Sequence, residues 1–180
     1  METAVIVIVI LCVLCLIYAV HVSNRFKQLH IKIQEAYADI EVMLIKRYDV
    51  LQQSLDAIKG YTSHEKKLML DLIKARRGMT IAQAQKVFDN QEQVLGNIRM
   101  VAEAYPQLSS SGLYMNLQQQ ITETNEHLAA SKRLYHANVS LYNQAIAVFP
   151  ACMIAGMTGN HPVKFLKDEN LAAKKEIHLR

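Results

Sequence analysis

Uncharged and mostly apolar residues fill the N-terminal part of the chain, from Ala4 to Val20. At 17 residues, this run is at the lower limit for a helix that spans a membrane, which needs about 20 residues. Its alternating valines and isoleucines are also typical of a strand, but an isolated strand leaves its backbone groups unpaired in lipid. The run therefore predicts a transmembrane helix over Ala4–Val20.

Two other interpretations of the run stay open, a cleaved signal peptide and a lipoprotein signal. A signal peptide normally has a positively charged start and a small-x-small cleavage site. Here the only charged side chain before the run is Glu2, and no such site follows. A lipoprotein signal needs a small residue before its cysteine, whereas leucines precede Cys12 and Cys15. The sequence favours an uncleaved single-pass anchor.

Lysines and arginines close to the run predict its orientation. None precedes it, whereas Arg25, Lys27 and Lys32 follow it. Positive residues are retained on the cytoplasmic side of a span. We therefore expect the C-terminal part of the chain to lie in the cytoplasm.

Apolar residues continue at helical spacing after the run, in steps of three and four. They are Ile33, Tyr37, Ile40, Leu44, Tyr48, Leu51, Leu55 and Ile58. Charged residues between them predict a solvated or partner-facing side, made of Glu35, Asp39, Glu41, Lys46, Arg47, Asp49 and Asp56. No helix breaker separates Val20 from Ile33, so the anchor and this helix are predicted to be continuous.

A second long helix is predicted after Gly60, a residue that suits a helix C-terminus. Thr62 and Glu65 fit a capping box at its start. Its apolar positions are Leu68, Leu72, Ala75, Met79, Ala82, Phe88, Leu95, Ile98, Ala102 and Tyr105. The pattern slips near Gln83–Gln85, which predicts a kink or a register shift, and Pro106 ends the helix.

A third long helix is predicted from Leu113 to Phe149, between the loop Ser109–Gly112 and Pro150. Its stripe is Leu117, Ile121, Thr124, Leu128, Ser131, Tyr135, Asn138, Tyr142, Ala145 and Phe149. The apolar segment Ala151–Met157 predicts a short fourth element. The tail from Asp168 is mostly charged and is predicted to fray.

These elements predict an all-α protein. A transmembrane anchor (1–22) precedes an up-and-down antiparallel bundle (23–167) of three long helices and a short C-terminal helix, followed by a polar tail (168–180). With Gly and Pro together contributing nine residues, the composition excludes collagen-like, proline-rich and linker-dominated chains.

Three collinear blocks resemble the LemA family. They are EAYADIEVMLIKRYDVLQQSLDAIKGYTSHEK (Glu35–Lys66), VAEAYPQL (Val101–Leu108) and LQQQITETNEHLAASKRLYHANVSLYNQAIAVFP (Leu117–Pro150). The resemblance covers the chain from Asn24 to about Glu169. It implies a bacterial protein of the cell envelope, in the inner membrane, with an N-terminal membrane helix and a helical bundle.

The resemblance brings no catalytic residues with it, and the chain departs from the family pattern in places. A proline is usual in the stretch that here reads Asp49–Gln53, and tryptophan is frequent where Tyr37 stands. Cys152 and the run Asn160–Pro162 are also unusual. These departures bear on partner specificity and not on the fold.

Charge and cysteine content narrow the classes of function. The net charge of +4 is only mildly basic, and a nucleic-acid-binding domain usually has a denser basic face. Two of the three cysteines lie in the apolar run and the third is Cys152, so no disulfide framework is predicted.

Several motifs suggest chemistry but lack the partners that the chemistry needs. His64-Glu65 begins like a zinc-peptidase motif, yet position 68 is Leu rather than His. His127 and His136 are nine positions apart and belong to different faces of a helix. Nothing nearby in sequence activates Cys152. Ser109–Gly112 is no phosphate loop. We therefore expect no metal, cofactor or catalytic residue.

Three further sets of residues are candidates for a catalytic or binding role. The carboxylates Glu35, Asp39 and Glu41 are close in sequence, and paired carboxylates can do acid–base work, although acidic residues on a long bundle helix usually line a solvated face. The tyrosines Tyr37, Tyr48, Tyr61, Tyr105, Tyr135 and Tyr142 suit bundle seams, with Tyr48 and Tyr61 also candidates for a binding surface. Small basic clusters stand at Lys46-Arg47, Arg76-Arg77 and Lys174-Lys175.

The sequence thus favours a non-enzymatic membrane scaffold that contacts a protein partner or a second copy of itself. The alternatives are an accessory subunit of an envelope enzyme or protease complex, and a lipid-binding membrane-surface module. Nucleic-acid binding through the basic clusters would show a steep salt dependence. No nucleic acid and no small-molecule substrate is expected.

Overall fold

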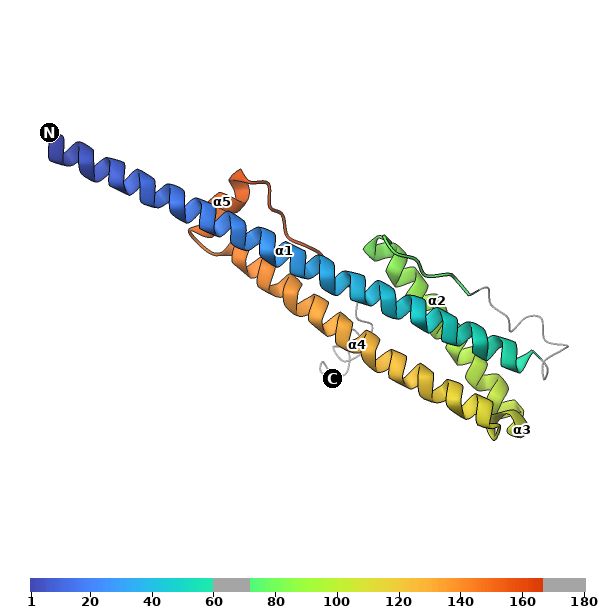
Figure 1. Cartoon of the computed structure of the whole chain (residues 1–180). Helices are drawn as coiled ribbons and strands as arrows, with labels where there is room; N and C mark the ends of the chain where they lie inside the picture. The colour runs from blue at the N-terminus through green and yellow to red at the C-terminus, as the bar shows by residue number, and fades with distance from the viewer. Residues whose placement is uncertain (60–71, 167–180) are drawn as a thin grey trace, which may run out of the picture. The chain divides into compact units, whose positions relative to one another are not determined.

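A computed structural model of the chain describes residues 1–59 and 72–166 (Figure 1). The described residues form helices and contain no strand, which confirms the all-α prediction. The helices are α1 (Glu2–Ile58), α2 (Ile81–Ala104), α3 (Pro106–Ser109), α4 (Gly112–Ala147) and α5 (Ala151–Met157).

Helix α1 joins the predicted anchor to the first bundle helix without a break, as predicted, over 57 residues. Its large apolar side chains up to Val20 are exposed, from 42% at Tyr18 to 67% at Leu16. The first buried apolar side chain is Val22. Within the described ranges, α1 is the helix that is long and apolar enough to cross a membrane on its own.

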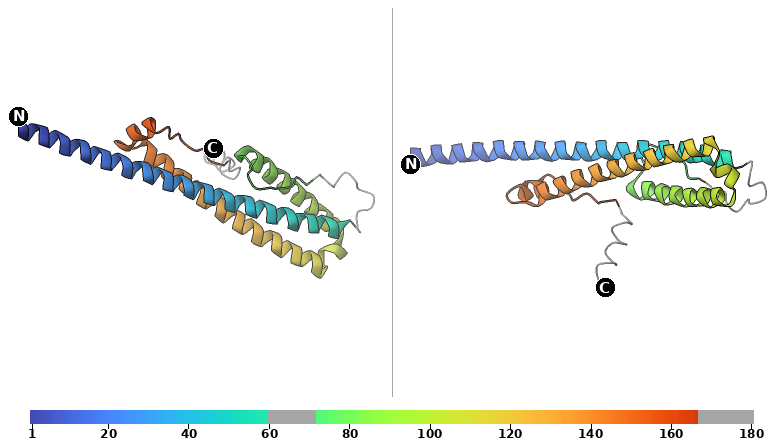
Figure 2. Two further views of the ribbon diagram at one scale, coloured as in Figure 1. Left: turned by 45° about the horizontal axis from the view of Figure 1, so that its top comes forward. Right: turned by 90° about the horizontal axis from the view of Figure 1, so that it is seen from below.

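The described chain forms two compact units, and the first comprises residues 1–36 and 134–165. Here α1 runs antiparallel to the end of α4, because Lys32 contacts Asn138 whereas His30 contacts Tyr142. Helix α5 follows α4 at an angle of 95°, and Figure 2 shows it at the end of α4 (orange). The buried apolar residues are Val22, Phe26, Ile33, Ala36, Tyr135, Val139, Tyr142, Ile146 and Ala155.

Among the described residues, the second unit comprises 37–59, 72–133 and Leu166. Its apolar core combines residues from α1, α2, α3 and α4. The core residues are Val50, Leu51, Leu55, Ile58, Val94, Leu95, Ile98, Val101, Ala102, Leu108, Tyr114, Leu117 and Ile121. All predicted apolar positions of α1 from Ile33 to Ile58 are buried except Tyr37 and Tyr48, which are half-buried.

The direction of α2 differs from the up-and-down order. Glu41 contacts Met79, Leu44 contacts Gln91, and Arg47 contacts Glu92, so positions advance together along both segments. Helix α2 therefore runs in the same direction as α1, as Figure 1 shows, while α4 returns after the short turn at α3. The bundle is confirmed, but its first two helices are parallel rather than antiparallel.

The second helix begins later than the sequence pattern indicated. Residues 72–80 are not helical, and Thr80 caps α2 with a capping box that includes Gln83. The apparent slip at Gln83–Gln85 is therefore the first turn of α2 and not a kink. Ala75 and Met79 are buried. Their spacing of four residues is the same as in a helix, although this segment is not helical. Gly60, the Thr62–Glu65 capping box and Leu68 lie outside the described residues.

The third helix and the short fourth helix are confirmed with small shifts. Helix α4 begins at Gly112 and ends at Ala147, two positions before the predicted end. Phe149 therefore leaves the stripe and is 75% exposed. Residues 106–109 form the single turn α3 instead of the start of an irregular loop. Helix α5 has the predicted bounds.

Candidate functional site

Glu41 organises the segment that leads into α2. Its carboxylate accepts hydrogen bonds from the backbone N–H groups of Gly78 at 3.1 Å and of Met79 at 2.6 Å. The Tyr37 hydroxyl donates to the Met79 carbonyl at 2.8 Å. Gly78 has a φ of 72°, a left-handed conformation that glycine adopts without a steric penalty. Glu41 therefore fixes a turn in place of a helix.

This arrangement corrects the sequence prediction for the acidic group. Glu41 is 5% exposed, and both of its oxygens bind backbone donors. Glu35 and Asp39 are exposed on α1. The structure gives Glu41 a structural role and does not bring the three carboxylates together in one site.

Arg47 is a second charged residue of α1 that is buried instead of solvated. Its side chain is 0% exposed, and Nη2 donates to Glu92 of α2 at 2.6 Å. Its guanidinium lies 5.4 Å from the centroid of the Phe88 ring, and Lys132 Nζ of α4 lies 3.2 Å from the same centroid. Cation–π contacts of this kind favour both cations. Phe88 thus links α1, α2 and α4.

Buried polar atoms near this cluster have spare hydrogen-bonding capacity. Gln91 Nε2 donates to the Leu44 carbonyl at 2.9 Å. Among the described residues, Gln91 Oε1 and Arg47 Nε and Nη1 are buried without a partner. An unpartnered buried polar atom costs free energy, so Arg47 is a costly residue at the centre of the second unit.

A basic pocket of about 210 Å³ opens beside the start of α2. Three cationic side chains, Lys74, Arg76 and Lys86, surround an apolar floor that includes Met79 and Val87. All three cations are exposed. We call these five residues the basic pocket. The sequence had singled out only Arg76, because Lys74 and Lys86 become neighbours only through the turn that Glu41 holds.

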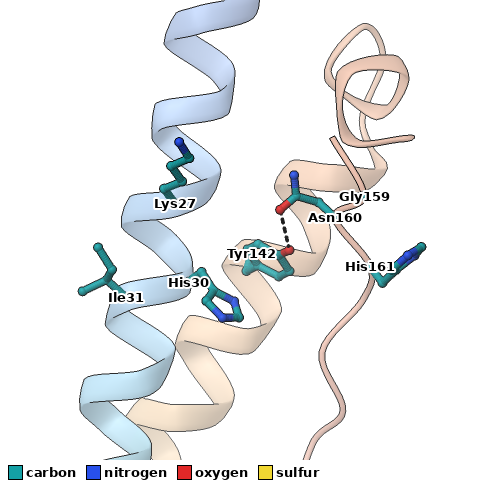
Figure 3. A pocket seen from close by; sticks show the side chains of 7 residues that line it. All are labelled: Lys27, His30, Ile31, Tyr142, Gly159, Asn160 and His161. Carbon is teal, nitrogen blue, oxygen red and sulfur yellow. Dashed lines mark hydrogen bonds between the residues drawn. The ribbon is translucent and has the colours of Figure 1, made fainter. Parts of the chain in front are cut away.

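A second hollow of about 500 Å³ lies in the first unit, close to the end of the apolar segment (Figure 3). Lys27, His30 and Ile31 line it from α1, Tyr142 from α4, and residues 159–161 from the segment after α5. The rings of His30 and Tyr142 are 5.8 Å apart. We call this hollow the juxtamembrane groove.

The segment after α5 is tied to α4 by side chains of α4. The Asn143 side chain donates to the Val163 carbonyl and accepts from the Val163 N–H, each at 2.9 Å. The Tyr142 hydroxyl donates to Asn160 Oδ1 at 3.1 Å, as Figure 3 shows. The Tyr135 hydroxyl donates to the Lys164 carbonyl at 2.9 Å. These bonds position the outer wall of the groove.

Burial changes the acidity of two tyrosines in this unit. Removal from water raises the pKa of Tyr135 and of Tyr142 above the ordinary value, because the charged phenolate is disfavoured. Both rings therefore pack in the helix seams, as predicted, while their hydroxyls reach polar partners. Tyr48 is half-buried, and Tyr61 lies outside the described residues.

The remaining candidates stay apart. His127 is exposed, whereas His136 packs against Tyr135 and Phe165. Cys152 is a free, half-buried cysteine of α5, and Cys12 and Cys15 are free and exposed on α1. No group of three His, Cys, Asp or Glu side chains capable of holding a metal occurs in residues 1–59 and 72–166. His64-Glu65 and Lys174-Lys175 lie outside these ranges.

Comparison with known families matches residues 36–179 to the LemA family. The chain belongs to the LemA family. The LemA match begins after the apolar part of α1 and covers all of α2, α3, α4 and α5. Comparison with curated proteins finds no match for the chain.

Proposed function

We propose that this LemA-family protein is a membrane-anchored scaffold that presents a helical bundle to a protein partner. The observation that carries the proposal is the division of α1, whose apolar side chains are exposed up to Val20 and buried at helical spacing from Val22 onward. One helix thereby supplies both a membrane span and a wall of the bundle. The fully occupied carboxylate of Glu41 also favours a structural role over acid–base chemistry.

We further propose that the anchor lies in the bacterial inner membrane with the bundle on the cytoplasmic side. No Lys or Arg precedes the span, and Arg25, Lys27 and Lys32 follow it. This asymmetry supports a cytoplasmic C-terminal part.

The surface proposed to meet a partner is the basic pocket. Lys74, Arg76 and Lys86 surround apolar side chains there, which suits an acidic segment that also carries apolar residues. Charge complementarity of this kind selects partners and speeds association. An envelope enzyme or protease is one class of partner, so the accessory-subunit alternative belongs to the same proposal.

Binding to lipid is a second candidate function, and one observation favours it. The juxtamembrane groove places Lys27 and two histidines, His30 and His161, directly after the apolar segment. Lysines near a membrane surface are attracted to anionic lipids. This function would not require the basic pocket.

Photo-crosslinking in living cells tests the scaffold proposal. A photoreactive residue at Arg77, exposed next to the basic pocket, should capture one defined protein, and Lys74→Glu with Lys86→Glu should abolish the capture. Lys46→Glu is the matched control, since Lys46 is an exposed cation on α1. Replacing residues 4–20 by an unrelated span should preserve capture, whereas deleting them should abolish it. Capture that survives the double charge reversal would refute the pocket as the partner surface.

A further inference from the structure

We propose that the corner between α4 and α5 inserts into the interfacial layer of the membrane, beside the span formed by α1. The α4–α5 corner is defined here as residues 148–157. The inference goes beyond the scaffold proposal, since it gives the protein a second contact with the bilayer. It rests on the proposed membrane span.

The level of the corner follows from the antiparallel contact between α1 and α4. His30 faces Tyr142, and Lys32 faces Asn138. Antiparallel helices rise equally per residue, so the five positions from Tyr142 to Ala147 bring the end of α4 to about the level of Arg25, and Phe149 follows two residues later. The exposed apolar segment of α1 ends at Val20. The corner thus lies where the span leaves the hydrocarbon.

The surface of the corner is suited to lipid and not to water. Val148, Phe149, Met153 and Met157 are exposed by 60%, 75%, 63% and 88%. No Asp, Glu, Lys or Arg stands between Arg133 and Lys164. Exposed apolar patches of this kind mark interaction sites. This uncharged stretch lies in the unit that also contains the apolar segment of α1, unlike the uncharged residues 104–122, which belong to the second unit.

The orientation of α5 agrees with an interfacial helix. It turns by 95° from α4, so it runs across the bundle axis and lies close to the membrane plane when α1 crosses the bilayer. Interfacial helices bury their apolar side at the boundary between headgroups and acyl chains and keep polar groups toward the water. Lys27, His30 and His161 of the juxtamembrane groove supply such polar groups beside it.

The position of the α4–α5 corner relative to the span indicates that lipid covers its exposed apolar side chains. The α4–α5 corner lies at the same height along α1 as the end of the proposed transmembrane segment. At that height the corner is surrounded by the bilayer. A second copy of the chain would be anchored at the same level and would have to displace that lipid. Self-association through the corner is therefore an outcome that the test must separate.

Spin labelling of the full chain in nanodiscs of phosphatidylcholine and phosphatidylglycerol tests the inference. Cys12, Cys15 and Cys152 are replaced by Ala, and single cysteines are introduced by Phe149→Cys and Met157→Cys. Leu134→Cys is the matched control, because Leu134 is also an apolar residue of α4, is 50% exposed, and lies about 20 Å further along the helix. Ile8→Cys reports on the span. Power saturation compares collisions with lipid-dissolved oxygen and with a water-soluble nickel chelate.

The inference predicts an oxygen-to-nickel collision ratio several-fold higher at positions 149 and 157 than at 134, together with a high ratio at position 8. Nickel access at 149 and 157 equal to that at 134, with position 8 still in lipid, would overturn the inference and leave the anchor intact. Strong spin–spin broadening at 149 would also overturn it, since a second copy would then cover the corner. Nickel access at position 8 would contradict both the inference and the proposed anchor.

Discussion

The side chain of Asn143 and the backbone of Val163 exchange two hydrogen bonds, each of 2.9 Å. The amide of an asparagine matches a backbone peptide group, because it offers one donor and one acceptor side by side. Through these two hydrogen bonds, α4 fixes the position of the segment after α5, in the way that paired backbone groups join neighbouring β-strands. The outer wall of the juxtamembrane groove depends on it.

We expect Asn143→Asp to weaken the first unit by about 1–3 kcal/mol, because a carboxylate cannot donate to the Val163 carbonyl and leaves that group unpaired. Gln144→Glu is the control, since Gln144 is exposed and its side chain donates to Ser140 of its own helix. Urea-dependent proteolysis in detergent micelles measures both. Equal stability of the two variants would show that the Asn143–Val163 pair does not hold this segment.

Glu41→Gln should loosen the turn before α2. An amide oxygen accepts more weakly than a carboxylate, and only one oxygen remains for the two N–H donors of Gly78 and Met79. We expect a loss of about 1–3 kcal/mol in the free energy of unfolding. Amide hydrogen exchange should become faster at Gly78 and Met79. Glu35→Gln, at an exposed position of the same helix, should change neither; unchanged exchange in Glu41→Gln would contradict the assigned role.

Arg47 gives two variants with different expected costs. Arg47→Ala leaves a cavity at a fully buried position and should cost about 2–5 kcal/mol. Arg47→Met keeps most of the volume, and removes a buried charge whose Nε and Nη1 are unpartnered among the described residues. Its cost should be much smaller, because apolar replacements of buried ion pairs are frequently neutral.

The partner of Arg47 makes this comparison informative. Glu92 is 49% exposed, so water solvates its carboxylate when Arg47 is replaced. Lys46→Ala, at an exposed position, should stay within about 0.5 kcal/mol of the parent. If thermal unfolding gave equal losses for Arg47→Met and Arg47→Ala, the guanidinium itself and not the filled volume would stabilise the bundle.

High pH should destabilise the fold through Tyr135 and Tyr142. Burial raises the pKa of both groups in the folded chain, so the unfolded chain loses these protons first as pH rises past about 10. Stability is therefore fully present below about pH 10 and falls as pH rises toward the higher folded pKa. Urea-dependent proteolysis between about pH 8 and pH 11 should reveal this fall.

Tyr135→Phe should reduce that alkaline fall, because it removes one of the tyrosines whose pKa is raised by burial; the pKa of Tyr114 is raised in the same way. At neutral pH it should cost about 0.5–1.5 kcal/mol through the lost hydrogen bond to the Lys164 carbonyl. Tyr105→Phe leaves both buried groups in place and should retain the whole fall. An alkaline loss of the same size in Tyr135→Phe as in the parent would exclude Tyr135 as a source of the pH dependence.

The sequence pattern predicted the helices well wherever apolar side chains are buried and polar side chains are exposed. The stripe from Ile33 to Ile58 is apolar at helical spacing and packs as predicted. Pro150 precedes α5 and Gly159 follows it, so the bounds of this helix could be predicted from the sequence. The continuity of α1 follows from the lack of any breaker between Val20 and Ile33.

The errors arise where a polar residue finds a partner far along the chain. Glu41 binds Met79, 38 positions away, and Arg47 binds Glu92, 45 positions away. Neither partner can be identified from local spacing, which therefore predicts a solvated or partner-facing side for both residues. The spacing of Ala75 and Met79 likewise imitated a helix, although the carboxylate of Glu41 holds that segment in a turn. The basic pocket was missed for the same reason.

The central claim is that α1 spans the membrane and continues into a bundle on the cytoplasmic side, and cysteine accessibility tests it most directly. In a chain without native cysteines, single cysteines at Thr3, Ile8 and Val42 are labelled with a membrane-impermeant maleimide in intact and in opened cells. The account predicts that Thr3 is labelled in intact cells, that Ile8 is not labelled in either, and that the exposed Val42 is labelled only after the cells are opened. Labelling of Val42 in intact cells, or of Ile8 in membranes, would contradict it.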